Sequence, residues 1–246
     1  MPSTVVHVAL AGLVGTALLA EYFDWKAVAA VMAATALVDF DVFVGFWIPG
    51  AHRAAFHTLV LPLLGGLVLW ADLRRGDDSL VRSRWGARGV RVSWVGLVAV
   101  TFAGIGLDAF FNGANLLYPL HDRFYTLDGK VFYSTEEGFV QTLVSVDFEA
   151  LVEAFAPEDA GAGSQSGSGA SGASGDGGTG GASGGSDAVR TTENTHYSTG
   201  VDPAKGAEDE NVERLFPIAY TGERALLALT GYLVVGMRVW MERQRE

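Results

Sequence analysis

The most reactive side chains of this sequence stand in one short stretch, between residues 39 and 57. Asp39 and Asp41 lie two residues apart inside an apolar run, and His52, Arg53 and His57 follow a Pro-Gly break. A carboxylate near the centre of a bilayer costs about 2.5 to 3.5 kcal/mol, so both aspartates need compensating partners. Imidazole and carboxylate together are typical ligands of divalent metals, and guanidinium is typical of phosphate recognition. The stretch therefore predicts metal-assisted chemistry on an anionic substrate.

Further His and Asp residues occur where they would extend this set. His7 opens the first apolar run, Asp108 lies in the fourth, and His121 and Asp122 follow its end. The chain has no Cys, so thiolate ligands are excluded and the expected cofactor is a divalent ion, zinc or manganese. Such ions activate water and stabilise a displacement at phosphorus. The alternative is a polar plug, in which Asp–Arg and Asp–His pairs tie helices together without a metal.

The spacing limits how many of these side chains can meet. On an ideal helix Asp39 and Asp41 point about 200° apart, so they share a site only if the helix is distorted or one aspartate supports the other's ligands. His52 and His57 are about 140° apart on a helix, which favours a position for His52 in the turn. Arg53 and His57, at i and i+4, share a helical face.

Five apolar runs are long enough, at about 20 residues, to cross a bilayer. They cover residues 4–23, 27–48, 54–71, 93–118 and 224–241. The connection 72–91 contains six Arg against three Asp, and the positive-inside rule places it in the cytoplasm. If each run crosses the membrane once, the N-terminus and the long acidic segment lie outside and the C-terminus lies in the cytoplasm. We therefore expect an all-α, multi-pass transmembrane bundle of about five helices, with the reactive residues near its external face.

Apolar and acidic residues belong to different segments of the chain. Hydrophobic residues make up 49%, the net charge is −11, and 18 of the 28 acidic residues lie between His121 and Glu223. That charge argues against a nucleic-acid partner, and an acidic composition with Arg in preference to Lys suggests a halophilic protein. Residues 160–187 are nearly all Gly, Ala and Ser, which predicts a flexible linker. Before them, a capping box at Ser134–Glu137 and apolar residues at helical spacing predict an amphipathic helix of about 20 residues.

Four parts of the chain follow from these patterns. They are membrane-embedded helices with the metal site (1–125), an external amphipathic helical segment (126–159), a disordered Gly/Ser/Ala-rich and acidic linker (160–215), and a last transmembrane helix with a cytoplasmic tail (216–246).

The order of the polar residues resembles the YdjM-like family of inner-membrane proteins, described as LexA-binding and as metal-dependent hydrolases. The matching pieces lie in about the first 120 residues: Thr4–Gly12 with His7, Asp39-Phe40-Asp41, His52–Thr58, and Leu107-Asp108 followed by Gly113 and Leu116–Pro119. The chain has Val38, Ala54 and Thr58 where the family usually has Pro, Gly and Ser, a difference that bears on local backbone shape. The resemblance implies a membrane-embedded hydrolase whose metal ligands are His7, Asp39, Asp41, His52, His57 and Asp108. LexA binding is not carried over, because a cytosolic repressor reaches only the cytoplasmic loops and tail.

The expected reaction is hydrolysis of a phosphoester at the external face of the cell membrane, on a small molecule or a lipid head group. Asp39 or Asp41 would bridge metals or act as a base, and Arg53 would hold the phosphate. Membrane lipid is therefore an expected partner, and no protein partner follows from the sequence. Two alternatives stay open: an ion- or proton-coupled transporter that uses the same Asp and His residues as a relay, and a non-catalytic membrane scaffold.

Overall fold

The computed structural model describes residues 3–48, 50–127, 131–135, 138–141, 189–202 and 214–245. These residues belong to two units. One is helical and contains the described residues up to 127 and from 189 onward, and the other is a small unit between residues 128 and 181. Helices dominate the described chain, as expected.

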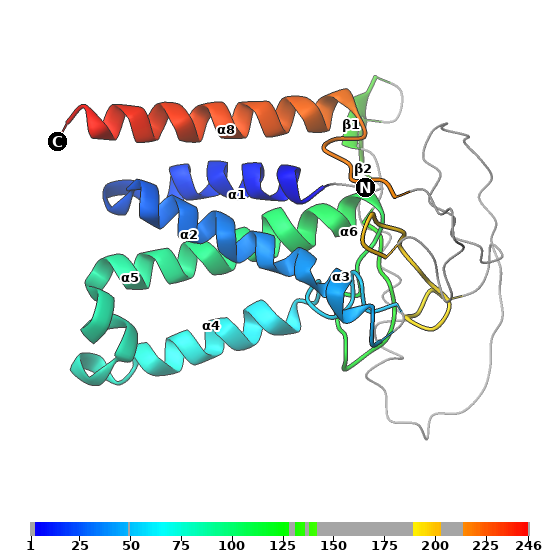
Figure 1. Ribbon diagram of the computed structural model, residues 1–246, viewed down its shortest axis with the longest axis horizontal. Coiled ribbons are helices and arrows are strands. Elements are labelled where there is room, and N and C mark those ends of the chain that lie inside the picture. Colours follow the sequence, from blue (N-terminus) through cyan, green and yellow to red (C-terminus); the bar gives the residue numbers. More distant parts are fainter. Residues whose placement is uncertain are drawn as a thin grey trace. The chain divides into compact units, whose positions relative to one another are not determined.

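Five longer helices form the helical unit, and Figure 1 shows them side by side. They are α1 (Thr4–Leu18), α2 (Trp25–Ala36), α4 (Val60–Leu73), α5 (Leu80–Ala99) and α8 (Gly222–Arg243). Helix α1 packs against α2, α5 and α8, and α5 packs against α2 and α4. Apolar side chains of α1, α2 and α5 form the main buried core.

In the part of the chain that the structure describes, three helical stretches are long and apolar enough to cross a membrane: Trp25–Val44, Leu80–Phe111 and Gly222–Arg243. Helices α1 and α4 are also apolar, but their 15 and 14 residues fall short of a full crossing. Among the described residues, the length criterion therefore supports three of the five predicted spans. Apolar side chains also cover the outside of the helices, since Leu63 of α4 is 70% exposed and Leu226 of α8 is 64% exposed. A surface of this kind suits lipid.

Helix boundaries differ from the prediction at the Arg-rich connection. Helix α5 already begins at Leu80, because the Asp72 carboxylate accepts hydrogen bonds from the N–H groups of Leu80 and Val81 and from the Ser79 hydroxyl. Ser79 in turn accepts from the Arg82 N–H. These contacts satisfy the free N–H groups of the first turn, so helical turns form among the arginines, with a kink at Gly86, whose φ of +64° and ψ of −160° are not helical.

Small residues allow close helix packing. A Cβ atom at Gly231 of α8 would lie 2.6 Å from the carbonyl oxygen of Ala9 in α1, and one at Gly12 would lie 2.7 Å from a methyl group of Val235. Such approaches are typical of helix pairs in membranes, where close van der Waals contact drives association.

Irregular helical turns follow α2 and α5. Helix α2 continues into the 3₁₀ turn η2 (Leu37–Phe40) and the short helix α3 (Asp41–Val44), and α5 continues into the π-helical η4 (Val100–Gly106) and the short helix α6 (Leu107–Phe111). The start of α1, helices α3 and α6, and the start of α8 all lie at one end of the helices (Figure 1). The predicted meeting of distant polar residues occurs at this end. Two further 3₁₀ turns, η1 (Ala20–Tyr22) and η3 (Gly76–Asp78), are short connections.

The small unit contains a β-hairpin where a helix cap was predicted. Strand β1 (Val131–Ser134) pairs antiparallel with β2 (Gly138–Gln141), and Phe132 lies opposite Val140. The predicted capping box is therefore wrong, because Ser134 ends a strand and Gly138, with φ +74°, starts the next one. Aromatic and β-branched residues bounded by a glycine favour such a hairpin. The rest of the predicted amphipathic helix, from residue 142 onward, lies outside the described residues.

Part of the predicted linker is structured. Residues 189–202 and 214–215 were assigned to a disordered segment, yet they form part of the helical unit. Residues 160–188 and 203–213 of that segment lie outside the described residues.

Candidate metal centre

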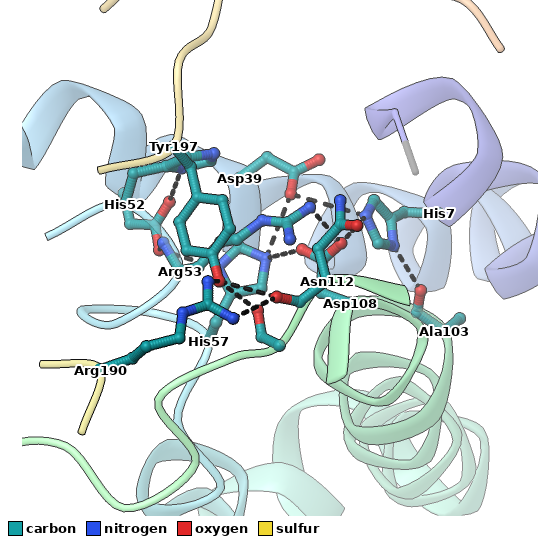
Figure 2. A network of polar contacts seen from close by, with 12 residues as sticks. His7, Asp39, His52, Arg53, His57, Ala103, Asp108, Asn112, Arg190 and Tyr197 are labelled. Atoms are coloured by element: carbon teal, nitrogen blue, oxygen red, sulfur yellow. Dashed lines mark hydrogen bonds and ion pairs between the residues drawn. The ribbon is translucent and has the colours of Figure 1, made fainter. Parts of the chain in front are cut away.

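Four side chains from four different elements converge at one end of the helical unit (Figure 2). His7 comes from α1, Asp39 from η2, His57 from the loop before α4, and Asp108 from α6. Ligand atoms of His7, Asp39 and Asp108 lie within 4.8 Å of one another. The Nε2 atom of His57 lies 2.8 Å from Oδ2 of Asp108 and 3.4 Å from Oδ1 of Asp39. His7, Asp39 and Asp108 therefore form a group that could hold a metal ion, and His57 contacts both carboxylates of that group.

Each of these two imidazoles is held by its other nitrogen. Nδ1 of His7 donates to the carbonyl oxygen of Ala103 over 2.6 Å, and Nδ1 of His57 donates to Oδ2 of Asp41 over 2.7 Å. Both acceptors lack a proton to give, so a neutral ring at either position carries its lone pair on Nε2. An acceptor on one imidazole nitrogen is the usual arrangement for a metal-binding histidine, because it fixes the ring's orientation and raises its basicity.

Asp41 supports the group without belonging to it. Its side chain is fully buried, Oδ1 lies 2.8 Å from Nδ1 of His52, and Oδ2 also accepts the N–H of Arg53 over 2.9 Å. The 3₁₀ turn η2 explains why Asp39 and Asp41 reach the same region. A 3₁₀ turn has about three residues per turn, so residues two apart, such as Asp39 and Asp41, point about 120° apart, against about 160° on an α-helix.

Arg53 forms a hydrogen bond with one carboxylate of this group. Its Nη2 donates to Oδ1 of Asp108 over 2.8 Å, and its guanidinium carbon lies 4.6 Å from the centre of the Tyr197 ring. The side chain is 1% exposed, and its Nε and Nη1 have no hydrogen-bond partner within the described residues. The backbone of Arg53 has φ +64°, and its carbonyl oxygen accepts the N–H of Asn115 over 2.9 Å. A buried cation with two unused donors is suited to bind an anion.

Sequence reasoning missed Tyr197, which lies beyond the Gly/Ser-rich segment. Its hydroxyl donates to the carbonyl oxygen of Asn112 over 2.8 Å and accepts a hydrogen bond from Arg190 (Figure 2). Burial raises the pKa of the Tyr197 hydroxyl, so the group stays a neutral donor. No signal in the sequence pairs this tyrosine with Arg53, because the contact joins segments far apart in the chain.

The segment of Tyr197 is tied to the loop after α6 and to the loop that carries His52 and His57. The carbonyl oxygen of Arg190 accepts the N–H of Phe124 over 2.9 Å, and Thr192 donates its N–H to Asp122 over 3.0 Å. A Cβ atom at Gly50 would lie 2.0 Å from the carbonyl oxygen of Thr192, so only glycine permits this approach.

The structure thus divides the predicted ligands into two groups. His7 and His57 face the carboxylates of Asp39 and Asp108, whereas Asp41 and His52 pair with each other beside them. The remaining two candidates make contacts outside these groups. His121 lies beside the ring of Tyr125, with 6.3 Å between the ring centres, and Asp122 bonds Asn115 and Thr192.

Charge and unpaired atoms fit a divalent cation. The buried carboxylates of Asp41 and Asp108, the half-buried carboxylate of Asp39 and the guanidinium of Arg53 together carry two net negative charges if the imidazoles are neutral. Nε2 of His7, Nε2 of His57 and Oδ2 of Asp39 also have no hydrogen-bond partner among the described residues. One divalent ion, or a proton on each of the two imidazoles, would restore neutrality. The second option is the polar plug, and metal analysis separates the two.

Comparisons with protein-family models, with curated proteins and with solved structures found no significant match. The functional argument therefore rests on the residues of this chain.

Proposed function

We propose that the protein is a membrane-embedded, metal-dependent hydrolase that cleaves a phosphoester at the external face of the membrane. One observation carries the proposal: the Nε2 atoms of His7 and His57 face the carboxylates of Asp39 and Asp108, while both Nδ1 atoms are already bonded. The resemblance to the YdjM-like family, seen in the order of these residues, supports the same proposal. A divalent ion held by these four side chains would act as a Lewis acid toward the phosphoryl group and lower the pKa of water.

Asp39 is the best candidate for the general base. Both oxygens of Asp41 are bonded to histidines, whereas Oδ2 of Asp39 has no partner among the described residues. In the proposed reaction the oxygen of water bonds to phosphorus while the ester P–O bond breaks. Asp39 accepts a proton from the water and returns it to the departing alkoxide, so the products are an alcohol and phosphate.

Arg53 is assigned to the substrate phosphoryl group. Its free Nε and Nη1 can donate to two oxygens of that group, while Nη2 stays bonded to Asp108. The Tyr197 ring lies against the guanidinium and holds its plane. Arg53 would therefore bind the phosphoryl group and stabilise the charge that develops during the reaction.

A proton relay is the second candidate, because His57 contacts Asp41 through one nitrogen and Asp108 through the other. Such a chain of buried acceptors and imidazoles also occurs in ion-coupled carriers. A relay needs no metal, which makes metal content the decisive measurement.

The test is elemental mass spectrometry on detergent-purified protein, with His7→Ala and His57→Ala beside the wild type. We expect one or more equivalents of zinc or manganese in the wild type and a loss in both variants. His121→Ala is the matched control and should keep its metal, since His121 lies outside the group. Absence of metal in the wild type, even after divalent ions are added back, would reject the hydrolase and favour the relay.

A further inference from the structure

A cavity of about 210 Å³ opens beside the candidate metal centre. Its polar wall includes Asp39, His52, Arg53 and Asp108. The opposite wall comes from residues 198–201 and 215–217 and from Tyr220, none of which the sequence linked to a site. The volume is about seven times the roughly 30 Å³ that one water occupies in the liquid, and it lies below the roughly 300 Å³ of the smallest common ligand pockets. A phosphoryl head group fits, whereas a larger substrate must extend beyond the cavity.

The opposite wall is a built structure that continues outward as an apolar surface. Nη1 of Arg214 donates to the carbonyl oxygens of Gly200 and Val201, and the hydroxyl of Ser3 donates to that of Ile218. Leu215 and Phe216 line the cavity and are also 49% and 70% exposed. Helix α8 begins a few residues later, at Gly222, as one of the three possible membrane spans. The apolar rim therefore lies next to the predicted start of a membrane crossing.

Gly200 sets the position of the Phe216 ring. A Cβ atom at residue 200 would lie 2.6 Å from two ring carbons of Phe216, so the ring packs directly on the glycine backbone. This contact fixes the position of an aromatic ring that lines the cavity and is also largely exposed.

We infer that residues 198–202 and 214–220 recognise the apolar part of an amphiphilic phosphoester, a lipid phosphate, whose head group occupies the cavity beside Arg53. The inference rests on the proposed function, because it names the substrate class of the same site. Two unused donors on a buried guanidinium recognise the phosphoryl group, and the exposed Leu215 and Phe216 contact the chain that leaves the cavity. A free small phosphate shares the head-group chemistry but lacks the chain.

The experiment compares ethyl phosphate with octyl phosphate, using full-length, manganese-loaded protein in lipid nanodiscs. The two esters have the same reacting group and differ only in chain length. We expect kcat/KM for octyl phosphate to exceed that for ethyl phosphate at least tenfold. Phe216→Ala should remove most of this difference, because kcat/KM should fall far more for octyl phosphate than for ethyl phosphate, while metal content stays the same. Gly200→Ala, which displaces the Phe216 ring without removing it, should act in the same direction.

Leu226→Ala is the control variant, since Leu226 is an exposed apolar residue of α8 that does not line the cavity. It should behave like the wild type with both esters. Equal kcat/KM for the two chain lengths would overturn the inference and leave the hydrolase intact. Equal losses of kcat/KM on both esters in Phe216→Ala would also overturn the inference.

Calorimetric titration of both esters separates failure of the inference from failure of the proposed function. Tighter binding of octyl phosphate without hydrolysis of either ester would reject the hydrolase and keep the ligand class. Binding that is equally strong for ethyl phosphate, octyl phosphate and inorganic phosphate would reject the ligand class.

Discussion

The carboxylate of Asp41 and the imidazole of His57 are joined by a 2.7 Å hydrogen bond, which turns Nε2 of that ring toward Asp108. His57 is therefore positioned by one aspartate and faces another. Asp41 affects any ligand at the candidate metal centre through the histidine, without touching that ligand.

Replacing Asp41 by Asn tests this indirect role. The amide cannot accept from His52, His57 and the Arg53 N–H as the carboxylate does, so His57 loses its fixed orientation. We expect metal affinity to fall about 10- to 100-fold, which is typical when the partner of a metal-binding histidine is removed. Competition with a calibrated chelator measures the change. Asp24→Asn, the same substitution at the start of α2, should leave affinity unchanged, and unchanged affinity in Asp41→Asn would contradict the assignment.

Arg53→Lys separates phosphate binding from metal binding. Lysine keeps the positive charge but loses the planar arrangement of donors that contacts Asp108 and leaves two N–H groups free. We expect turnover of octyl phosphate to fall about 100-fold, as for the loss of one donor to a transition-state oxyanion. Metal content should not change. Arg82→Lys, at the start of α5, is the control, and full activity in Arg53→Lys would exclude a role for the guanidinium in catalysis.

Gly231→Leu probes the contact between α1 and α8. A side chain at residue 231 would meet the backbone of Ala9 at 2.6 Å, and the two helices must then separate. We expect the free energy of unfolding to fall by about 1 to 3 kcal/mol, as in other overpacked contacts. Thermal unfolding in detergent measures the change. Gly236→Leu on the same helix is the matched control, because a Cβ there has no atom within 4 Å.

The hydrogen bonds of Asp24 at the start of α2 predict that this carboxylate stabilises the fold and that acid removes its contribution. Burial alone would raise its pKa, but hydrogen bonds from the Ala27 N–H and from Arg88 outweigh it and hold the pKa below the usual value. A carboxyl group with a depressed pKa stabilises the fold above its unfolded-state pKa, which is about 3.9, and loses that contribution as pH falls toward the folded-state value. Thermal unfolding between pH 5 and pH 2.5 should therefore show a smaller acid-induced loss in Asp24→Asn. Parallel curves would contradict the prediction.

The location of the candidate site was accessible from the sequence, whereas its internal contacts were not. Apolar run lengths and the arginines of residues 72–91 were enough to expect His7, His57 and Asp108 at one end of the helices. The different contacts of Asp39 and Asp41 depend on the 3₁₀ turn at Leu37–Phe40, which contains neither Gly nor Pro. No helix-breaking residue marks that turn, so residue spacing on an ideal helix could not reveal it.

The segment of Tyr197 was not predicted, for a different reason. Residues 189–202 are mostly polar and follow a Gly/Ser-rich stretch, and such a composition predicts a linker. Its order comes from contacts with distant residues, such as Thr192 with Asp122 and the Tyr197 ring with Arg53.

The π-helical turns of Val100–Gly106 make the centre sensitive to chain length as well as to side-chain identity. Their wider winding is equivalent to one extra residue in an α-helix, and it lies between the packed part of α5 and Asp108. Deleting one residue within Val100–Gly106 would therefore return the segment to regular α-helical winding and leave Asp108 directed toward His7. A deletion in the regular part of α5 lacks this compensation and would rotate every later position by about 100° around the axis, so Asp108 would turn away from His7 although every site residue is still present. The effect of a deletion in this helix is thus expected to depend on whether it falls inside or outside the π-helical turns.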